Sequence, residues 1–90
     1  MINQIIDIIK INAIKFSDRW VVTKSNERRL LTLLSEIGEL ADSIKGKHNH
    51  PVEVELIQIA GICTNWLVAL KAEKDFDLQI AMNIANHEEI

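Results

Sequence analysis

Apolar side chains recur at helical spacing along almost the whole chain, and this pattern limits the fold more than any other feature of the sequence. The 90 residues include one proline and three glycines, so few positions interrupt a helix. A period of 3.6 residues predicts an all-α protein rather than a β fold with many turns. The stripes that carry it are Ile2, Ile5, Ile6, Ile9, Ala13 and Phe16, then Leu30, Leu33, Leu34, Ile37, Leu40, Ala41 and Ile44, and near the end Phe76, Ile80 and Ile84.

The segments between these stripes predict about four helices in one domain, residues 1–90. We expect helices over residues 2–17, 26–45 and 51–73 and a shorter last helix, with an ordered loop over residues 17–24. Residues suited to helix ends stand at the expected boundaries. They are Ser25 or Asn26 before the second helix, Gly46 after it, Pro51 at the first position of the third, and Asp75 or Asp77 before the last.

A chain of this size buries a smaller fraction of its surface than a longer one. The first helix also has Ile8, Ile11 and Ile14 off its main stripe, and a helix with more than one apolar face usually has more than one neighbour. We therefore expect a homodimer or a higher homo-oligomer, which would complete the helical bundle.

The charge and the apolar run exclude some classes of partner. The formal net charge of -3 argues against a nucleic-acid-binding protein. The uncharged run from Leu56 to Leu70 is shorter than the roughly 20 residues of a membrane span, so we expect a buried core helix and no membrane contact. Cys63 cannot form an internal disulfide, and the first residues lack a secretory signal, so we expect the cytoplasm.

Three glutamates stand in the apolar stretches of the second and third predicted helices. Glu36 and Glu39 are spaced i, i+3 at the border of one apolar stripe, and about 100° per residue places Glu55 on the inner side of the next helix, with Glu53 on the outer side. Buried carboxylates are costly unless they are protonated, paired or bound to a cation. All-oxygen ligands suit hard cations, so we expect Mg²⁺. In the alternative interpretation, Glu36 and Glu39 belong to a solvated helix face.

The residues around these glutamates resemble the MazG-like all-α nucleoside triphosphate pyrophosphohydrolases. The stretch from Leu34 to Ala41 is similar to that family's first metal motif, and the stretch from Glu55 to Ala60 is similar to its second. The resemblance implies an antiparallel helical bundle that hydrolyses a nucleoside triphosphate to the monophosphate and pyrophosphate with Mg²⁺. It also implies that Glu36, Glu39 and Glu55 are ligands and catalytic residues.

The chain departs from this family in several places. Gln58 stands where the second motif normally has an aspartate, so its amide oxygen would be the fourth ligand and the site would hold Mg²⁺ less tightly. Ser35 replaces a frequent glutamate. Asn83 and Asn86 are the only loose counterparts of the family's later phosphate-binding residues.

Other residues have a functional and a structural interpretation. Trp20 could stack on a nucleobase or cover the core, and Asn65 could contact the substrate or bond a neighbouring helix. His48 and His50 could chelate zinc, although a solvated turn is the commoner use of such a pair. For Cys63 we expect a small core residue.

Three classes of function follow. The first is a Mg²⁺-dependent pyrophosphohydrolase acting on a nucleotide substrate, with the removal of unwanted nucleotides as its role. The second is a weakened or inactive helical module that acts through oligomerisation or partner binding, which Gln58 and the surplus apolar faces favour. The third is a helix-turn-helix regulator. The sequence gives it little support, because no basic recognition helix is present.

Overall fold

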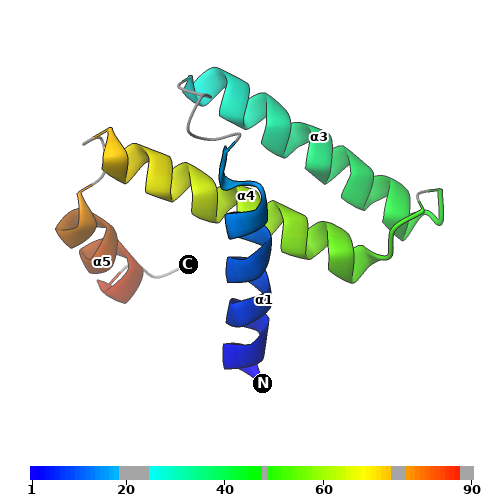
Figure 1. The fold of residues 1–90 in the computed structure, drawn as a ribbon, viewed down its shortest axis with the longest axis horizontal. Coiled ribbons are helices and arrows are strands. Elements are labelled where there is room, and N and C mark those ends of the chain that lie inside the picture. Colours follow the sequence, from blue (N-terminus) through cyan, green and yellow to red (C-terminus); the bar gives the residue numbers. More distant parts are fainter. Residues whose placement is uncertain (19–24, 48, 74–76, 88–90) are drawn as a thin grey trace.

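A computed structural model describes residues 1–18, 25–47, 49–73 and 77–87, and these residues form helices and connecting turns without strands. The helices are α1 (Ile2–Lys15), α3 (Asn26–Ile44), α4 (Val52–Ala72) and α5 (Leu78–His87) (Figure 1). The all-α prediction with four helices is therefore confirmed, and the predicted helix bounds are correct to within about two residues.

Helix α3 begins and ends with the predicted capping residues. The Ser25 hydroxyl accepts a long hydrogen bond, 3.5 Å, from the Arg28 backbone N–H. After the helix, Gly46 has a φ of 72°, a left-handed conformation that glycine adopts without strain. The Lys47 N–H then donates to the Asp42 carbonyl at 2.8 Å, which closes the end of the helix.

Helices α4 and α5 begin differently from each other. The sequence placed Pro51 at the first helical position, but its backbone is extended (φ -70°, ψ 162°) and α4 begins at Val52, so Pro51 is the N-cap. Of the two aspartates proposed to cap the last helix, Asp77 has this role, because its carboxylate accepts the N–H groups of Gln79 and Ile80 at 3.0 and 3.1 Å.

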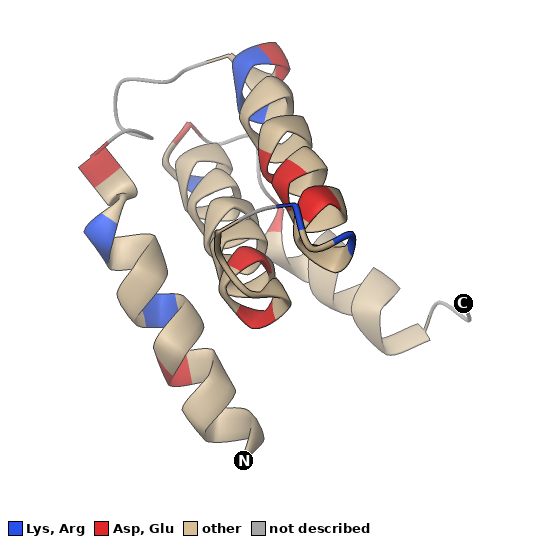
Figure 2. Ribbon diagram, turned by 90° about the vertical axis from the view of Figure 1, so that its right-hand side faces the viewer, with Lys and Arg blue, Asp and Glu red and all other residues tan. Residues whose placement is uncertain are grey.

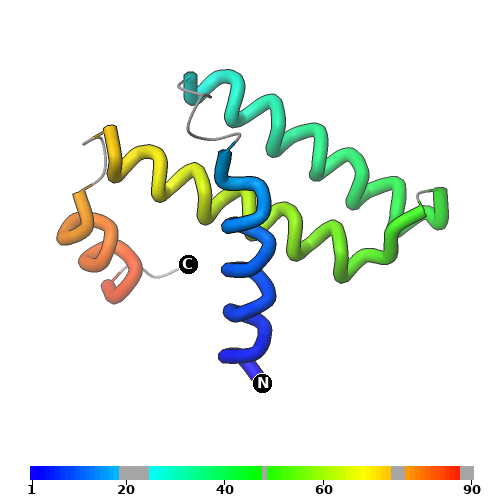
Figure 3. Tube along the Cα trace, viewed as in Figure 1, coloured from blue at the N-terminus to red at the C-terminus, as the bar shows by residue number. Residues whose placement is uncertain are grey.

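Helix α4 is the central element of the fold. Helix α3 lies beside it in the opposite direction, and α1 crosses it steeply (Figures 1 and 3). Among the described helices, α5 packs against none of the other three. Figure 2 shows α1 on one side of the α3–α4 pair and α5 on the other.

The crossing of α1 over α4 is possible because Gly61 lets the two backbones approach. A Cβ atom at this position would clash with the Asn12 side chain and meet the Ala13 backbone at 3.6 Å. One turn further along α4, the buried Asn65 amide donates to the Ala13 carbonyl at 2.9 Å. A small residue and a hydrogen bond therefore position α1.

A second polar cluster joins the start of α3 to the end of α4. The fully buried Arg29 guanidinium donates to both carboxylate oxygens of Glu73, at 2.7 and 3.2 Å, and to the Asn26 side-chain oxygen at 3.0 Å. The same Asn26 oxygen accepts the Trp66 indole N–H at 2.9 Å. This bidentate ion pair fixes the position of α3 along the axis of α4.

The apolar core within one chain is small. Ala13 is the only buried apolar side chain among the described residues. The prediction of α4 as a buried core helix holds only on its two packed sides, because Leu56 and Leu67 remain half exposed. Cys63 is exposed, so its assignment as a core residue is wrong.

By length and composition alone, α4 could cross a membrane. Core helices share these properties. The contacts of α4 with α1 and α3, together with the full burial of Glu55, show that it is packed on two sides, while 22% of its apolar window is buried.

Candidate metal centre

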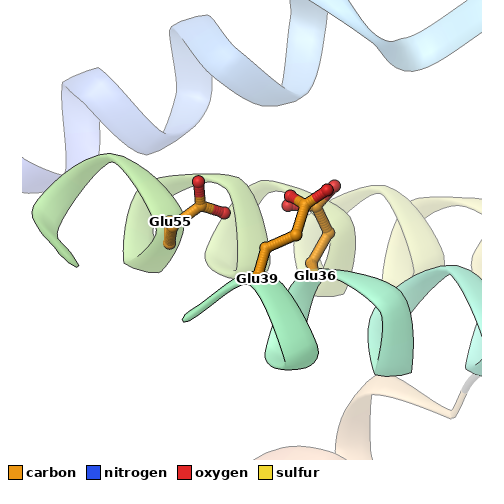
Figure 4. Close-up of side chains that lie close together, drawn as sticks. All are labelled: Glu36, Glu39 and Glu55. Carbon is orange, nitrogen blue, oxygen red and sulfur yellow. The ribbon is translucent and has the colours of Figure 1, made fainter. Parts of the chain in front are cut away.

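Helices α3 and α4 bring three carboxylates together near the turn that joins them. Glu36 and Glu39 lie one turn apart on the last half of α3, and Glu55 is in the first turn of α4 (Figure 4). One oxygen from each of the three lies within 4.8 Å of the others. Because the helices are antiparallel, Glu36 and Glu39 share one site with Glu55, which lies 19 and 16 positions further along the sequence.

Burial separates the two glutamates at the start of α4 as the helical count predicted. Glu55 has no exposed surface, whereas Glu53 is exposed. Glu36 and Glu39 are half-buried. Glu36 and Glu39 are therefore partly exposed, as the alternative of a solvated helix face requires, but their carboxylates are turned toward Glu55.

The crowding of like charges changes the proton affinity of the site. Burial raises the pKa of Glu36 from 4.5 to about 7, with further contributions from a hydrogen bond to Glu39 and from the negative charges of Glu39 and Glu55. Near neutral pH, Glu36 is therefore protonated in a large fraction of the molecules.

Gln58 lies one turn after Glu55 and takes part in the same cluster. The amide can be oriented so that both its oxygen and its nitrogen face suitable hydrogen-bonding partners. In this orientation the nitrogen donates to a Glu36 oxygen at 3.0 Å and to a Glu55 oxygen at 3.3 Å. The sequence suggested the amide oxygen as a metal ligand. That role stays a prediction, and it requires the amide to turn over.

His50 is a member of the cluster that sequence reasoning missed. Its Nδ1 lies 3.2 Å from a Glu55 oxygen, although a solvated turn was the commoner interpretation for this residue. The Ser43 hydroxyl donates to the His50 carbonyl at 2.8 Å and so holds the turn against α3. The feature of the sequence that could have indicated this contact is that His50 precedes Glu55 by five residues, across the start of α4. His48, its suggested zinc-binding partner, lies outside the described residues.

Two of the predicted substrate residues, Asn65 and Asn83, do not lie in this cluster. The Asn65 amide bonds the neighbouring helix α1, which was the structural alternative for this residue. Asn83 is exposed on α5, where it accepts a hydrogen bond from Gln79 at 3.1 Å. Trp20 lies outside the described residues, so its proposed stacking role stays a prediction.

The donor set of the cluster fits a hard divalent cation. Carboxylate oxygens from two helices converge, and the fully buried Glu55 needs a compensating positive charge or proton. The partial exposure of Glu36 and Glu39 leaves one side of the site open to water and to a ligand.

Comparisons of the chain with protein-family models, with curated proteins and with solved structures found no match. The likeness to MazG-like enzymes therefore rests on the two acidic motifs of the sequence. The structure defines the class of the protein: its described residues form four helices, with a three-carboxylate cluster between two of them.

Proposed function

We propose that this protein is a Mg²⁺-dependent nucleoside triphosphate pyrophosphohydrolase that releases a nucleoside monophosphate and pyrophosphate. The observation that carries the proposal is the convergence of Glu36, Glu39 and the fully buried Glu55 from two antiparallel helices. The resemblance of both acidic motifs to MazG-like enzymes supports the class of substrate.

The three carboxylates would have different roles. Glu36, Glu39 and Glu55 would each give an oxygen to the cation, which when bound neutralises phosphate charge and lowers the pKa of a coordinated water. The second oxygen of the partly exposed Glu36 could accept a proton from an attacking water. The partly exposed side of the cluster would admit the triphosphate, while the buried Glu55 anchors the opposite side.

The test is pyrophosphate release from a panel of nucleoside triphosphates with Mg²⁺. We expect Glu36→Gln and Glu55→Gln each to lower the rate by at least about 100-fold, the lower bound for loss of a general base. Glu53→Gln is the matched control, because Glu53 is exposed two residues from Glu55 and should keep the parent rate. Lack of release from every nucleotide, or equal rates for Glu55→Gln and the parent, would contradict the proposal.

A second candidate, a non-catalytic helical module, is favoured by one specific observation. The Gln58 amide and the His50 ring already contact the carboxylates, so the cluster is partly compensated without a cation. Titration calorimetry separates the two functions. The enzyme should bind Mg²⁺ together with a non-hydrolysable nucleotide analogue, whereas the module should bind neither.

A further inference from the structure

The two carboxylate oxygens of the buried Glu55 contact different partners. Its Oε1 atom lies 3.2 Å from Nδ1 of His50, in the turn that precedes α4. Its Oε2 atom accepts the Gln58 amide at 3.3 Å, in the orientation in which that amide also donates to Glu36. Oε2 therefore faces the part of the cluster that α3 supplies, and Oε1 faces the turn.

The start of α4 explains why His50 reaches Glu55. Pro51 is the N-cap of α4 and Val52 is its first residue, so His50 directly precedes the cap and Glu55 is the fourth residue of the helix. Side chains at these two positions commonly pack on each other, usually as an apolar pair. In this chain the pair is polar, and its contact follows from the geometry of a helix start.

The backbone of His50 is held from both sides. Its carbonyl accepts the Ser43 hydroxyl at 2.8 Å, which ties the turn to the helix that carries Glu36. Pro51 follows directly, and a residue before proline is restricted to extended conformations. The ring of His50 is thus attached to a backbone with little freedom, so holding it against Glu55 costs little conformational entropy.

Glu55 is the carboxylate of the cluster for which such a support matters most. Its side chain has no exposed surface, whereas the side chain of His50 is 54% exposed, so the ring helps to cover a buried carboxylate. Glutamate has a long, flexible side chain, and a ligand that turns into another rotamer leaves the reach of a cation. Hydrogen bonds from neighbouring residues normally fix the direction of a ligating carboxylate.

We propose that His50 is a positioning residue: its ring holds Oε1 of Glu55, and this turns Oε2 toward the carboxylates of Glu36 and Glu39. The consequence for cation binding rests on the proposed function. Gln58 has to release Oε2 before that oxygen can bind a cation, but His50 contacts the other oxygen and keeps its hydrogen bond. His50 therefore supports Glu55 both without and with a bound cation.

Leucine and asparagine at position 50 give a matched pair of variants, because their side chains have the same branched shape. Asparagine places an N–H donor as many bonds from the backbone as Nδ1 of histidine, whereas leucine has no donor. His50→Asn should therefore restore what His50→Leu removes. If the ring only filled space in the turn, the two variants would behave alike, and this result would overturn the proposal.

The first measurement is the position of Glu55 in metal-free crystals of the full chain. In the parent, one oxygen of Glu55 lies within 4.8 Å of oxygens of Glu36 and Glu39. We expect His50→Asn to keep this arrangement and His50→Leu to lose it, because a buried carboxylate without its donor turns toward water. An unchanged position of Glu55 in His50→Leu would overturn the proposal.

The second measurement is the affinity for Mn²⁺, by titration calorimetry at a temperature at which each variant is folded. We expect His50→Leu to bind Mn²⁺ at least about tenfold more weakly than the parent, and His50→Asn to recover most of that loss. His87→Leu is the control, because His87 is exposed on α5 and should leave the affinity unchanged.

The calorimetry separates failure of this inference from failure of the proposed function. Equal Mn²⁺ affinities of His50→Leu and the parent would overturn the role of His50. A parent that binds no Mn²⁺ would contradict the proposed function, and the metal-free crystals would then decide whether His50 positions Glu55.

Ser43→Ala repeats the test from α3 if His50→Leu fails to fold. This substitution frees the turn from α3 and leaves the imidazole in place. We expect weaker Mn²⁺ binding than in the parent, because the ring is then held less firmly against Glu55. An affinity equal to that of the parent would contradict the proposal.

Discussion

At the scale of single residues, Glu36 is where the electrostatic cost of the acidic cluster appears. Its raised pKa shows that the protonated form is favoured beside Glu39 and Glu55. A bound cation beside Glu36 would lower this pKa, so the raised value belongs to the metal-free protein. The charge of Glu36 therefore affects both the stability of the metal-free protein and the proposed binding of a cation.

The pH dependence of stability follows from the direction of this shift. Because the folded pKa of about 7 exceeds the unfolded value of 4.5, the contribution of Glu36 is fully present below pH 4.5 and is lost as the pH rises through 7. For this partly exposed group we expect a loss of about 1–2 kcal/mol, discounted for solvent screening. Urea unfolding without metal at pH 5 and pH 8 measures it. Glu36→Gln should remove this part of the slope and Glu53→Gln should not; an unchanged slope in Glu36→Gln contradicts the assignment.

Gln58 should set the balance between the metal-free and metal-bound cluster. Gln58→Asp replaces a donor to two carboxylates by a fourth negative charge. We expect the metal-free protein to unfold more easily and the Mg²⁺ affinity to rise by about tenfold, because ligand charge governs the affinity of such sites. Calorimetric titration measures the affinity, with Gln79→Asp on α5 as the control. Weaker binding by Gln58→Asp would show that the position lies outside the site.

The sequence predicted part of this site because helical geometry is regular. A count of 100° per residue was enough to place Glu55 inward and Glu53 outward, and to pair Glu36 with Glu39. It could not predict the contact of His50 with Glu55, because that depends on the conformation of a turn. The orientation of the Gln58 amide could not be predicted either, because its hydrogen-bonding partners include a residue of the other helix.

At the scale of helices, Gly61 determines how closely α1 packs on α4. A Cβ at Gly61 meets the Asn12 side chain and the Ala13 backbone, whereas a Cβ at Gly38 meets nothing within 4 Å. The two positions therefore separate helix propensity from packing.

Alanine at these two glycines gives a direct comparison. Gly38→Ala should stabilise the protein by about 0.5–1 kcal/mol through helix propensity alone. Gly61→Ala should be less stable than Gly38→Ala by at least about 1 kcal/mol, because Asn12 must move and α1 is displaced. Urea unfolding at one fixed protein concentration checks both values. Equal gains at the two sites would mean that α1 does not pack on Gly61.

Removing one partner of the Arg29–Glu73 ion pair, at the start of α3, should destabilise the protein. Glu73→Ala leaves the fully buried Arg29 with fewer acceptors, and we expect a loss of about 2 kcal/mol, below the value for a fully buried pair because Glu73 is partly exposed. Arg29→Leu combined with Glu73→Ala should recover part of this loss. A double-mutant cycle measures the coupling, and purely additive effects would show that the pair contributes nothing.

The bounds of the helices were predictable because they depend on local chemistry. Ser25, Gly46 and Asp77 act through their own side chains or backbone dihedrals, which neighbouring residues determine. Packing was less accessible to prediction. The exposure of Cys63 shows why: an apolar run indicates a core helix without telling which of its sides finds a partner.

At the scale of the whole molecule, a single chain is less compact than expected and leaves many large apolar side chains exposed. The radius of gyration is 14.4 Å, compared with about 12 Å for a compact domain of this length. The extra isoleucines of the first helix, Ile8, Ile11 and Ile14, gave the same indication in the sequence, because that helix has apolar residues on more than one side. The oligomer expected from the sequence would supply further apolar contacts.

The central claim is that Glu36, Glu39 and Glu55 bind a divalent cation, and a crystal of the full chain grown with Mn²⁺ in place of Mg²⁺ tests it most directly. We expect an anomalous difference peak about 2.0–2.3 Å from an oxygen of each of the three carboxylates, and no such peak in Glu55→Gln crystals. A parent crystal with Mn²⁺ at saturating concentration and no peak among these oxygens would contradict the account.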